Sequence, residues 1–295
     1  MKSQQTLPTV VRHAAGTCAA SPISAADSAR CARLRKRREA VRPNRRRSLR
    51  RILAGATAAI LVPCAYISVS ASLLYVHSRP TVDHYIAEYS LPGQVARAER
   101  IPRSMTDALI AVEDRKFKFH HGVDWAALRG ALGEDFHSLS FSHGGSTITM
   151  QTVRYLALPS DKTITRKVAE IALAKHLERN VPKSQILLLY CDSVTFGLHT
   201  AGLEDASKTY FGVQPQRLTL AQSALLAGLI ANPPATVADL PMAAADVVRN
   251  RALSALQDRF PYKYSQAQID DARSETLAFS WQVATPVASH WRTGR

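Results

Sequence analysis

The hydrophobic pattern shows a single long apolar run ahead of a helical region. Residues 52–76 form a stretch of 25 positions without a charged side chain. As a helix rising ~1.5 Å per residue, this run is roughly 37 Å long and crosses a hydrocarbon core of ~30 Å with some tilt. We therefore predict one transmembrane helix at 52–76, in which Pro63 is tolerated as it is in other membrane helices.

Beyond Ser104 the apolar residues recur mostly at helical spacing, and alternating strand patterns are nearly absent. Ser104 and Ser146 are placed to cap two helices, and Asn232-Pro233-Pro234 is a firm stop for a third. Together these features predict a mainly α domain over 101–260. Its expected helices are 105–117, 123–132, 147–158, 163–179, 183–190, 201–210, 218–230 and 242–260.

The remaining segments are read from composition. Residues 1–51 form a basic tail that we expect to be largely disordered, because its first part is rich in Ser, Thr and Ala without periodicity. Residues 77–100 are a juxtamembrane connection and 261–295 a C-terminal tail. Four cysteines, at positions 18, 31, 64 and 191, suit neither a disulfide framework nor a zinc site.

The net charge of +15 suggests a nucleic-acid partner, but its distribution argues against one. Residues 1–51 hold 14 of the 38 Lys and Arg with only two acids, whereas the rest of the chain has 24 bases and 21 acids. A DNA-binding domain spreads its positive charge over a folded face. We therefore predict no nucleic-acid partner.

The same charge asymmetry predicts the orientation of the transmembrane helix. Twelve Lys and Arg at 30–51 precede the apolar run, and few follow it. The positive-inside rule places such a flank in the cytoplasm and residues 77–295 on the outer side. A cleaved signal peptide is the alternative, with Ser70 and Ala71 as small residues near a cleavage site, but both its basic region and its apolar region would be too long.

Four clusters of residues carry candidate chemistry. Each has an ordinary reading: Glu113 as a solvated acid, Gly144-Gly145-Ser146 as a loop with a helix cap, Arg166 and Glu170 as a surface pair, and Tyr190 as helix core. Their order and spacing favour a common site. The clusters are EDRKFKFHHG at 113–122, GGSTITMQ at 144–151, RKVAE at 166–170 and KSQILLLY at 183–190.

Taken together, over about residues 85–260, these motifs resemble glycosyltransferase family 51, the transglycosylase module of penicillin-binding proteins and of monofunctional peptidoglycan transglycosylases. A weaker fifth motif lies at 248–256. The resemblance implies a lysozyme-like fold with a membrane-associated jaw. The candidate jaw is Phe117–Phe141, although a core helix explains its apolar positions equally well: Trp125, Leu128, Leu132, Phe136 and Leu139. About 35 residues follow Phe260, so the chain resembles the monofunctional type.

The resemblance implies polymerisation of glycan strands from lipid II, by inverting transfer with release of polyprenyl diphosphate. It assigns Glu113 as the general base and Glu170 as the second acidic catalytic residue, which orients cations or contacts a metal or the donor. The substrate-binding residues that it implies are Asp114, Phe117 (equally well core), His120, Thr147, Gln151, Arg154 in place of the usual Lys, and the diphosphate pair Arg166 and Lys167.

The resemblance also bears on cofactors, partners and location. It allows a divalent cation, Mg²⁺ or Mn²⁺, with the metal ligands unknown, and implies no organic cofactor. The expected partners are lipid II, the growing glycan strand, the membrane, and cell-wall synthesis and division proteins. The expected location is the bacterial inner membrane, with the catalytic domain in the periplasm.

Four departures from the family pattern leave two other readings open. Met150, Asp192, Gln222 and Val248 stand where the family commonly has Gln, Asn, Glu and Arg. These changes favour a weak enzyme or an inactive membrane scaffold that recruits wall-synthesis partners, whereas the intact Glu113 favours activity. A lysozyme-like hydrolase is the second rival, but it has no need of the Arg166 and Lys167 pair or of an anchor.

Overall fold

The structure is a computed structural model that describes residues 25–138 and 145–283. The chain divides into two compact units, 1–64 and 65–295. In the first unit the described residues belong to helix α1 (Ala25–Tyr89), which continues into the second unit. The segment Arg47–Tyr89 of α1 is long and apolar enough to cross a membrane, and the most apolar part of it buries no side chain against the protein. Its composition therefore fits the transmembrane helix expected at 52–76.

Helix α1 extends well beyond the predicted transmembrane segment on both sides. Residues 25–51 were expected to be largely disordered and 77–100 to be a connection, but the structure is helical at 25–89. Ala, Leu, Arg and Lys have high helix propensity, and an apolar helix already formed supplies the nucleus from which a helix propagates at low cost. The disorder expected at 1–24 lies outside the described residues.

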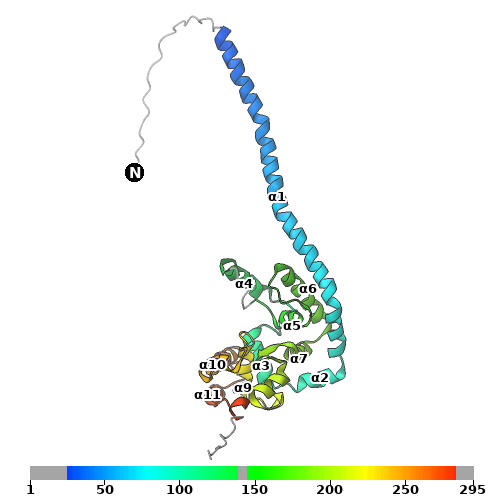
Figure 1. Cartoon of the computed structure of the whole chain (residues 1–295), viewed down its shortest axis with the longest axis vertical. Helices are drawn as coiled ribbons and strands as arrows, with labels where there is room; N and C mark the ends of the chain where they lie inside the picture. Colours follow the sequence, from blue (N-terminus) through cyan, green and yellow to red (C-terminus); the bar gives the residue numbers. More distant parts are fainter. Residues whose placement is uncertain (1–24, 139–144, 284–295) are drawn as a thin grey trace, which may run out of the picture. The chain divides into compact units, whose positions relative to one another are not determined.

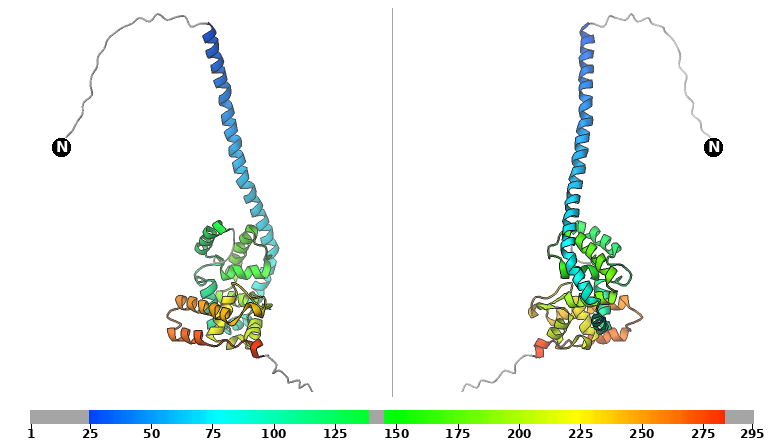
Figure 2. Two further views of the ribbon diagram at one scale, coloured as in Figure 1. Left: turned by 60° about the vertical axis from the view of Figure 1, so that its left-hand side comes forward. Right: turned by 90° about the vertical axis from the view of Figure 1, so that its right-hand side faces the viewer.

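The domain core is larger than the predicted boundaries 101–260. On the N-terminal side, α1 buries Val82 and Tyr89 against the domain, and α2 (Pro92–Glu99) packs on α7 (Lys183–Ser193). Figure 2 shows this end of α1 alongside the folded domain. On the C-terminal side, α11 (Gln266–Ser274) and the segment leading to α12 (Ser280–Val283) bury Ile269 and Phe279. The segments predicted to be a connection (77–100) and a C-terminal tail (261–295) thus contribute side chains to the core.

One group of helices forms the base of the domain. Helices α3 (Arg103–Glu113), α9 (Leu220–Leu229) and α10 (Met242–Arg259) pack on one another, and α11 packs on α10. Helix α9 consists mainly of Leu and Ala and is buried on nearly all sides. Ser104 does not cap α3, whose N-cap is Pro102; its hydroxyl lies 3.0 Å from that of Ser223 on α9. It joins two packed helices instead.

A second group of helices faces the first across the domain (Figure 1). It comprises α4 (Trp125–Ser138), α5 (Ile148–Ala157) and α6 (Ile164–Asn180), with α5 packed on both α6 and α7. Thr147, rather than the predicted Ser146, caps α5 by accepting a hydrogen bond from the Met150 N–H. In the candidate jaw, Trp125 is 53% exposed and Leu128 is buried, so α4 has both an exposed and a core-facing side. The expectations for Leu132, Phe136 and Leu139 concern side chains outside the described part of the structure.

The strands seen in the described part of the chain form one small hairpin. Strand β1 (Thr195–Gly197) pairs antiparallel with β2 (Thr200–Ala201). Leu198 and His199 at its tip have φ of 51° and 58°, as a tight two-residue turn requires. The hairpin leads into α8 (Leu203–Phe211) and the short helix η1 (Pro215–Arg217), and a second short helix, η2 (Val237–Asp239), lies between α9 and α10. The mainly α fold predicted from the sequence is confirmed.

Candidate active site

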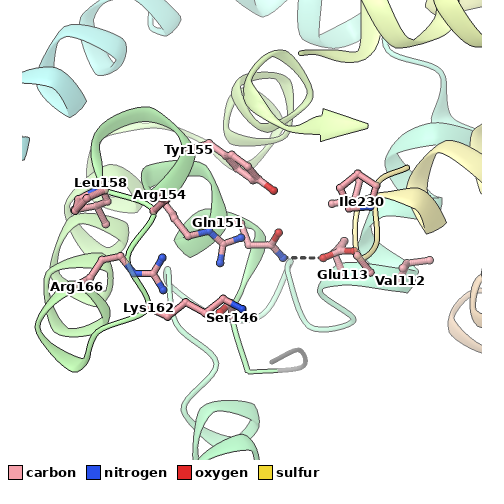
Figure 3. Close-up of a pocket in the computed structure, with 14 residues that line it drawn as sticks. Val112, Glu113, Ser146, Gln151, Arg154, Tyr155, Leu158, Lys162, Arg166 and Ile230 are labelled. Atoms are coloured by element: carbon pink, nitrogen blue, oxygen red, sulfur yellow. Dashed lines mark hydrogen bonds between the residues drawn. The ribbon is translucent and has the colours of Figure 1, made fainter. Parts of the chain in front are cut away.

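A cavity of about 770 Å³ lies between the two groups of helices. It receives side chains from the end of α3, from α5, from the start of α6 and from the chain after α9 (Figure 3). Most of these segments carry motifs that the sequence singled out. The lining residues are Val112, Glu113, Ser146, Gln151, Arg154, Tyr155, Leu158, Pro159, Ser160, Lys162, Arg166, Ile230, Ala231 and Pro233.

Glu113 is the acidic side chain that lines this cavity. It is the last residue of α3, which ends because Asp114 has an extended backbone, with φ of −154° and ψ of 79°. The amide Nε2 of Gln151 on α5 donates a hydrogen bond of 2.7 Å to Glu113 Oε2. The hydroxyl of Tyr190 on α7, fully buried, donates to Gln151 Oε1 at 3.1 Å. Glu113 is therefore a partly exposed carboxylate whose orientation is fixed by a hydrogen bond from Gln151 on α5.

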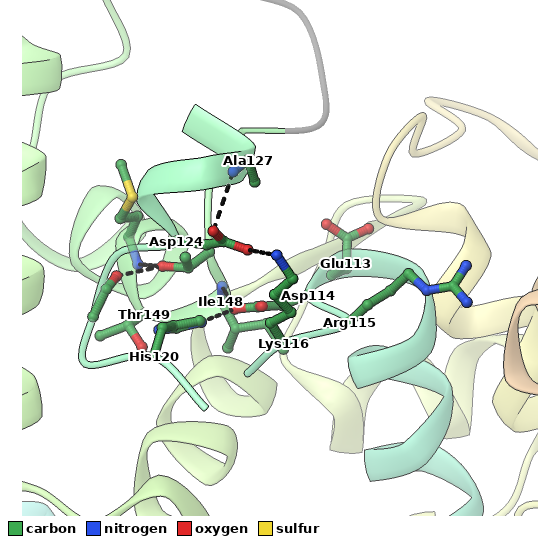
Figure 4. Close-up of polar contacts among 12 residues, drawn as sticks. Glu113, Asp114, Arg115, Lys116, His120, Asp124, Ala127, Ile148 and Thr149 are labelled. Carbon is green, nitrogen blue, oxygen red and sulfur yellow. Dashed lines mark hydrogen bonds and ion pairs between the residues drawn. The ribbon is translucent and has the colours of Figure 1, made fainter. Parts of the chain in front are cut away.

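Asp114 faces a different network and does not line the cavity (Figure 4). Its carboxylate accepts a hydrogen bond from the Ile148 N–H at 3.0 Å and lies 2.8 Å from His120 Nε2. Ile148 is the first residue of α5, where a negative charge is favourable because the helix leaves its first N–H groups unpaired. Asp114 and His120 thus fix the start of the helix that carries Gln151.

Phe117 and Thr147 are also structural supports of the site. Phe117 is fully buried, with the ammonium of Lys183 4.3 Å from its ring centroid, so of its two readings the structure favours core packing. The Thr147 hydroxyl donates to the Gly122 carbonyl at 2.6 Å while it caps α5. Both residues lie beneath the cavity wall instead of lining it.

The glycines of the motifs allow these close approaches. Gly122 has φ of +87°, and a Cβ there would lie 2.9 Å from the carbonyl oxygen of Ala174 on α6. At Gly145 a Cβ would lie 2.7 Å from the Ala131 Cβ on α4. Real Cβ atoms do not approach other heavy atoms so closely, and positive φ favours glycine. A side chain at Gly122 would therefore collide with α6, and one at Gly145 would collide with α4.

The far side of the cavity is cationic. Arg154, Lys162 and Arg166 line it, and Arg166 is held near the start of α6 with only 8% of its surface exposed. The Nε of Arg166 has no hydrogen-bond partner among the residues that the structure describes. A buried guanidinium with a free N–H and neighbouring positive charges is suited to an anionic ligand.

Lys167 lies next to this cationic wall and is positioned by two contacts. Its Nζ is 2.6 Å from the Ser146 hydroxyl and 3.0 Å from Glu170 Oε1. Burial lowers the pKa of Lys167, the charge of Glu170 raises it, and the nearby Arg154 and Arg166 lower it further. The net direction is a lowered pKa, so this ammonium is easier to deprotonate than an exposed lysine.

Glu170 has no exposed surface and does not line the cavity. One of its oxygens holds Lys167, and the other, Oε2, has no hydrogen-bond partner in the described part of the chain. A carboxylate in this position cannot reach a substrate hydroxyl directly. The structure therefore favours the orienting role for Glu170 over that of a base.

The structure brings part of the predicted site together around the cavity and places the rest behind it. Glu113, Gln151, Arg154 and Arg166 line the cavity. Directly behind them lie Lys167, Glu170, Asp114, Phe117, His120 and Thr147. Among the polar lining residues, sequence reasoning missed Ser146, Tyr155, Ser160 and Lys162. Ser146 belongs to a recognised motif, whereas nothing in the sequence marked the other three.

The four departures from the family pattern lie away from the cavity. Met150 is fully buried, and Gln222 completes a capping box with Thr219 that a glutamate would form equally well. Asp192 contacts Tyr89 and Arg97, and Val248 packs near Gly228. None of them removes a lining side chain.

An acid on one wall and several cations on the other define a site for acid–base group transfer on an anionic substrate. Residues 83–257 match the transglycosylase family. A Cupriavidus necator protein named as a transglycosylase is 38% identical over 199 residues, which cover 67% of this chain and 84% of that protein. The chain belongs to the transglycosylase family, and its activity is peptidoglycan glycosyl transfer.

Penicillin-binding proteins share the same region. Penicillin-binding protein 1A of Haemophilus influenzae is 33% identical over 237 residues, which cover 76% of this chain and 27% of that protein. Penicillin-binding protein 1A of Escherichia coli is 34% identical over 193 residues, which cover 65% and 22%. The chain thus spans about a quarter of the length of these relatives. The mainly helical fold with an apolar N-terminal helix is consistent with the lysozyme-like architecture of the transglycosylase domain.

Proposed function

We propose that this protein polymerises glycan strands from lipid II by inverting glycosyl transfer, with release of polyprenyl diphosphate. The observation that carries the proposal is the cavity with Glu113 on one wall and Arg154, Lys162 and Arg166 on the other. A sugar joined to a diphosphate needs both walls: a base for the attacking hydroxyl and cations for the leaving group.

Glu113 acts as the general base. The 4-hydroxyl of the acceptor sugar attacks the anomeric carbon of the donor and transfers its proton to the Glu113 carboxylate as the new glycosidic bond forms. Gln151 donates to Oε2 of this carboxylate and holds it at the cavity wall. Attack from the face opposite the diphosphate inverts the anomeric configuration.

The cationic wall receives the leaving group. As the bond from the anomeric carbon to the phosphate oxygen breaks, its electron pair stays on the diphosphate, and Arg154 and Arg166 stabilise the charge that develops. Lys167, held by Ser146 and Glu170, adds a third cation beside them. Charge-assisted contacts of this kind contribute about 1.5–3 kcal/mol each.

The residues around the cavity do not fit a resident divalent cation. Among the described residues there is no group of three or more His, Cys, Asp or Glu side chains that could hold a metal. The nearby acids are engaged, Glu113 by Gln151 and Glu170 by Lys167, and the other wall is positively charged. No step is therefore assigned to Mg²⁺ or Mn²⁺, and a test for stimulation by either ion would use metal-free protein.

A lipid-linked substrate requires a site near a membrane, because its polyprenyl chain stays in the bilayer. Helix α1 supports such an arrangement, since Arg47–Tyr89 can cross a membrane and Asp83 at its end contacts His176 on α6. We place the N-terminus in the cytoplasm and the domain in the periplasm of the inner membrane, where cell-wall synthesis and division proteins are the expected partners.

The test is polymerisation of lipid II by the detergent-purified protein. Formation of glycan chains longer than a disaccharide supports the proposal. A folded protein that forms no polymer but binds wall-synthesis proteins would be a scaffold. Cleavage of isolated wall sacculi in the absence of lipid II would identify a hydrolase instead.

A further inference from the structure

We propose that Tyr190 is a positioning residue for the base: it fixes the side-chain amide of Gln151 in the one orientation that presents an N–H to Glu113. The inference rests on the proposed function of Glu113. The sequence reads Tyr190 only as part of the core of α7. In the structure its hydroxyl donates to Gln151 Oε1 at 3.1 Å, and Gln151 Nε2 donates to Glu113 Oε2 at 2.7 Å.

A glutamine amide has two orientations that differ in what they offer a neighbour. In one, the NH₂ group faces the Glu113 carboxylate and stabilises its ionised form. In the other, the amide oxygen faces the carboxylate and repels it. Shape and packing barely distinguish the two orientations, because oxygen and nitrogen are nearly the same size. Ionised Glu113 favours the first orientation, but a protonated carboxyl could instead donate to the amide oxygen in the second. The orientation is fixed in both protonation states only by the hydrogen-bond partner at the other end of the amide.

Tyr190 is that partner, and its surroundings make it a donor. The side chain is fully buried, and burial raises the pKa of its hydroxyl, with the negative charge of Glu113 adding to the effect. The hydroxyl therefore keeps its proton. If the Gln151 amide turned over, the buried O–H would lose its acceptor, which a buried polar group does not tolerate well. Tyr190 thus selects the orientation in which Gln151 supports a base.

The hydrogen bonds from Tyr190 to Gln151 and from Gln151 to Glu113 form a relay, and the other charged groups around Glu113 do not depend on it. Asp114 and Arg115 follow it directly, and α5, α6 and the segment between them contribute cations and one tyrosine. The segment after α9 adds only Ile230, Ala231 and Pro233 to the cavity wall. Among the described residues, the other charged or titratable side chains that line the cavity are Arg154, Tyr155, Lys162 and Arg166. Removal of the Tyr190 hydroxyl leaves all of them in place.

The test compares Tyr190→Phe with Tyr210→Phe. The control tyrosine is also fully buried, but its hydroxyl donates to the Phe196 carbonyl at 2.7 Å, away from the cavity. In Tyr190→Phe we expect the acid limb of the pH profile of lipid II polymerisation to move up by roughly half a pH unit or more, because ionised Glu113 loses its fixed donor. In Tyr210→Phe the limb stays where it is in the wild type.

A second comparison shows whether Tyr190 acts through Gln151. Gln151→Met keeps the size of the side chain but removes its hydrogen bonds. If the relay is real, Gln151→Met moves the acid limb as Tyr190→Phe does, and adding Tyr190→Phe to it moves the limb no further. A full additional shift in the double variant would mean that Tyr190 acts in some other way.

A readout without substrate separates this inference from the proposed function. The carboxyl signal of Glu113 can be followed by NMR titration in protein labelled with ¹³C-glutamate. An unchanged Glu113 titration in a folded Tyr190→Phe variant overturns the relay, whereas a wild type that does not polymerise lipid II counts against the proposed function. If Tyr190→Phe does not fold, Gln151→Met decides: an unshifted Glu113 titration in that variant also overturns the relay.

Discussion

Lys167 holds its ammonium 3.0 Å from Oε1 of Glu170, three residues further along α6, and Glu170 is fully buried. The two residues differ in their access to the cavity. Lys167 contacts the Ser146 hydroxyl at the cavity wall, whereas Glu170 has no solvent-exposed surface. The charge of Glu170 opposes the burial that lowers the pKa of Lys167. We therefore expect Glu170 to act by keeping Lys167 protonated and in place.

This relationship predicts the effect of Glu170→Gln on the alkaline side of the pH profile. The amide can still accept a hydrogen bond from Lys167, but the negative charge that raises its pKa is gone. The Lys167 pKa should fall further, so polymerisation should decline at a pH lower by on the order of one unit. Glu204→Gln is the control, because Glu204 forms an exposed pair with Lys208 on α8. An unmoved alkaline limb would show that this pair does not govern activity.

Glu113→Gln should remove the base with little other change. The amide keeps the size of the side chain but does not accept a proton from the acceptor sugar. Turnover of lipid II should fall by about 10²–10⁴-fold, with donor binding largely retained. Rates at saturating lipid II, compared with those of Glu204→Gln, measure the effect. Near-normal polymerisation by Glu113→Gln would refute the assignment.

Asp192→Asn should stabilise the protein at neutral pH. Burial raises the pKa of Asp192, although Tyr89 and Arg97 oppose the shift. The ionised form thus destabilises the fold above the raised pKa, and this penalty disappears as the pH falls below the ordinary aspartate value. Asparagine still accepts the Tyr89 hydrogen bond, and the lost pair with the exposed Arg97 contributes little.

The measurement for Asp192→Asn is thermal unfolding across pH. We expect the variant to melt higher at pH 7, by roughly 2–4 °C for each kcal/mol gained. The difference from the wild type should shrink toward acid pH, where the wild-type carboxylate is protonated. A variant that is less stable at every pH would mean that the Arg97 pair outweighs the burial of the charge.

Gly122→Ala should destabilise the second group of helices. The φ of +87° is unfavourable for alanine, and the added Cβ would lie 2.9 Å from the Ala174 carbonyl oxygen. We expect a loss of about 1–3 kcal/mol in the free energy of unfolding. Gly130→Ala is the matched control, because a Cβ there meets no atom within 4 Å and alanine favours the helix. Denaturant unfolding of both variants tests the difference, and equal stability would contradict it.

The orientation of α1 gives a prediction about topology. The basic flank of twelve Lys and Arg at 30–51 precedes the apolar segment, so the domain should lie on the outer side of the membrane. A reporter that is active only after export, fused behind Arg295, should therefore be active. Activity of a reporter that works only in the cytoplasm would reverse the assignment.

Sequence patterns were enough to predict the mainly α class, the family and the residues of the motifs. Helical periodicity needs no tertiary information, and the motif order is specific because four clusters must occur in sequence at set spacings. The predicted starts of the helices were less accurate. Ser104 and Ser146 looked like caps, but Pro102 and Thr147 take those positions. Several nearby residues could begin a helix, and packing selects among them.

Which motif residues face the cavity depends on how the helices pack. Glu113 and Asp114 are neighbours in the chain, yet one lines the cavity and the other fixes the start of α5, because α3 ends between them. Burial likewise separates Glu170 from Glu113, although both are acidic motif residues. The contact between Tyr190 and Gln151 joins positions 39 residues apart, and no local pattern encodes it. Such contacts arise when α5 packs on α7, which is a property of the whole fold.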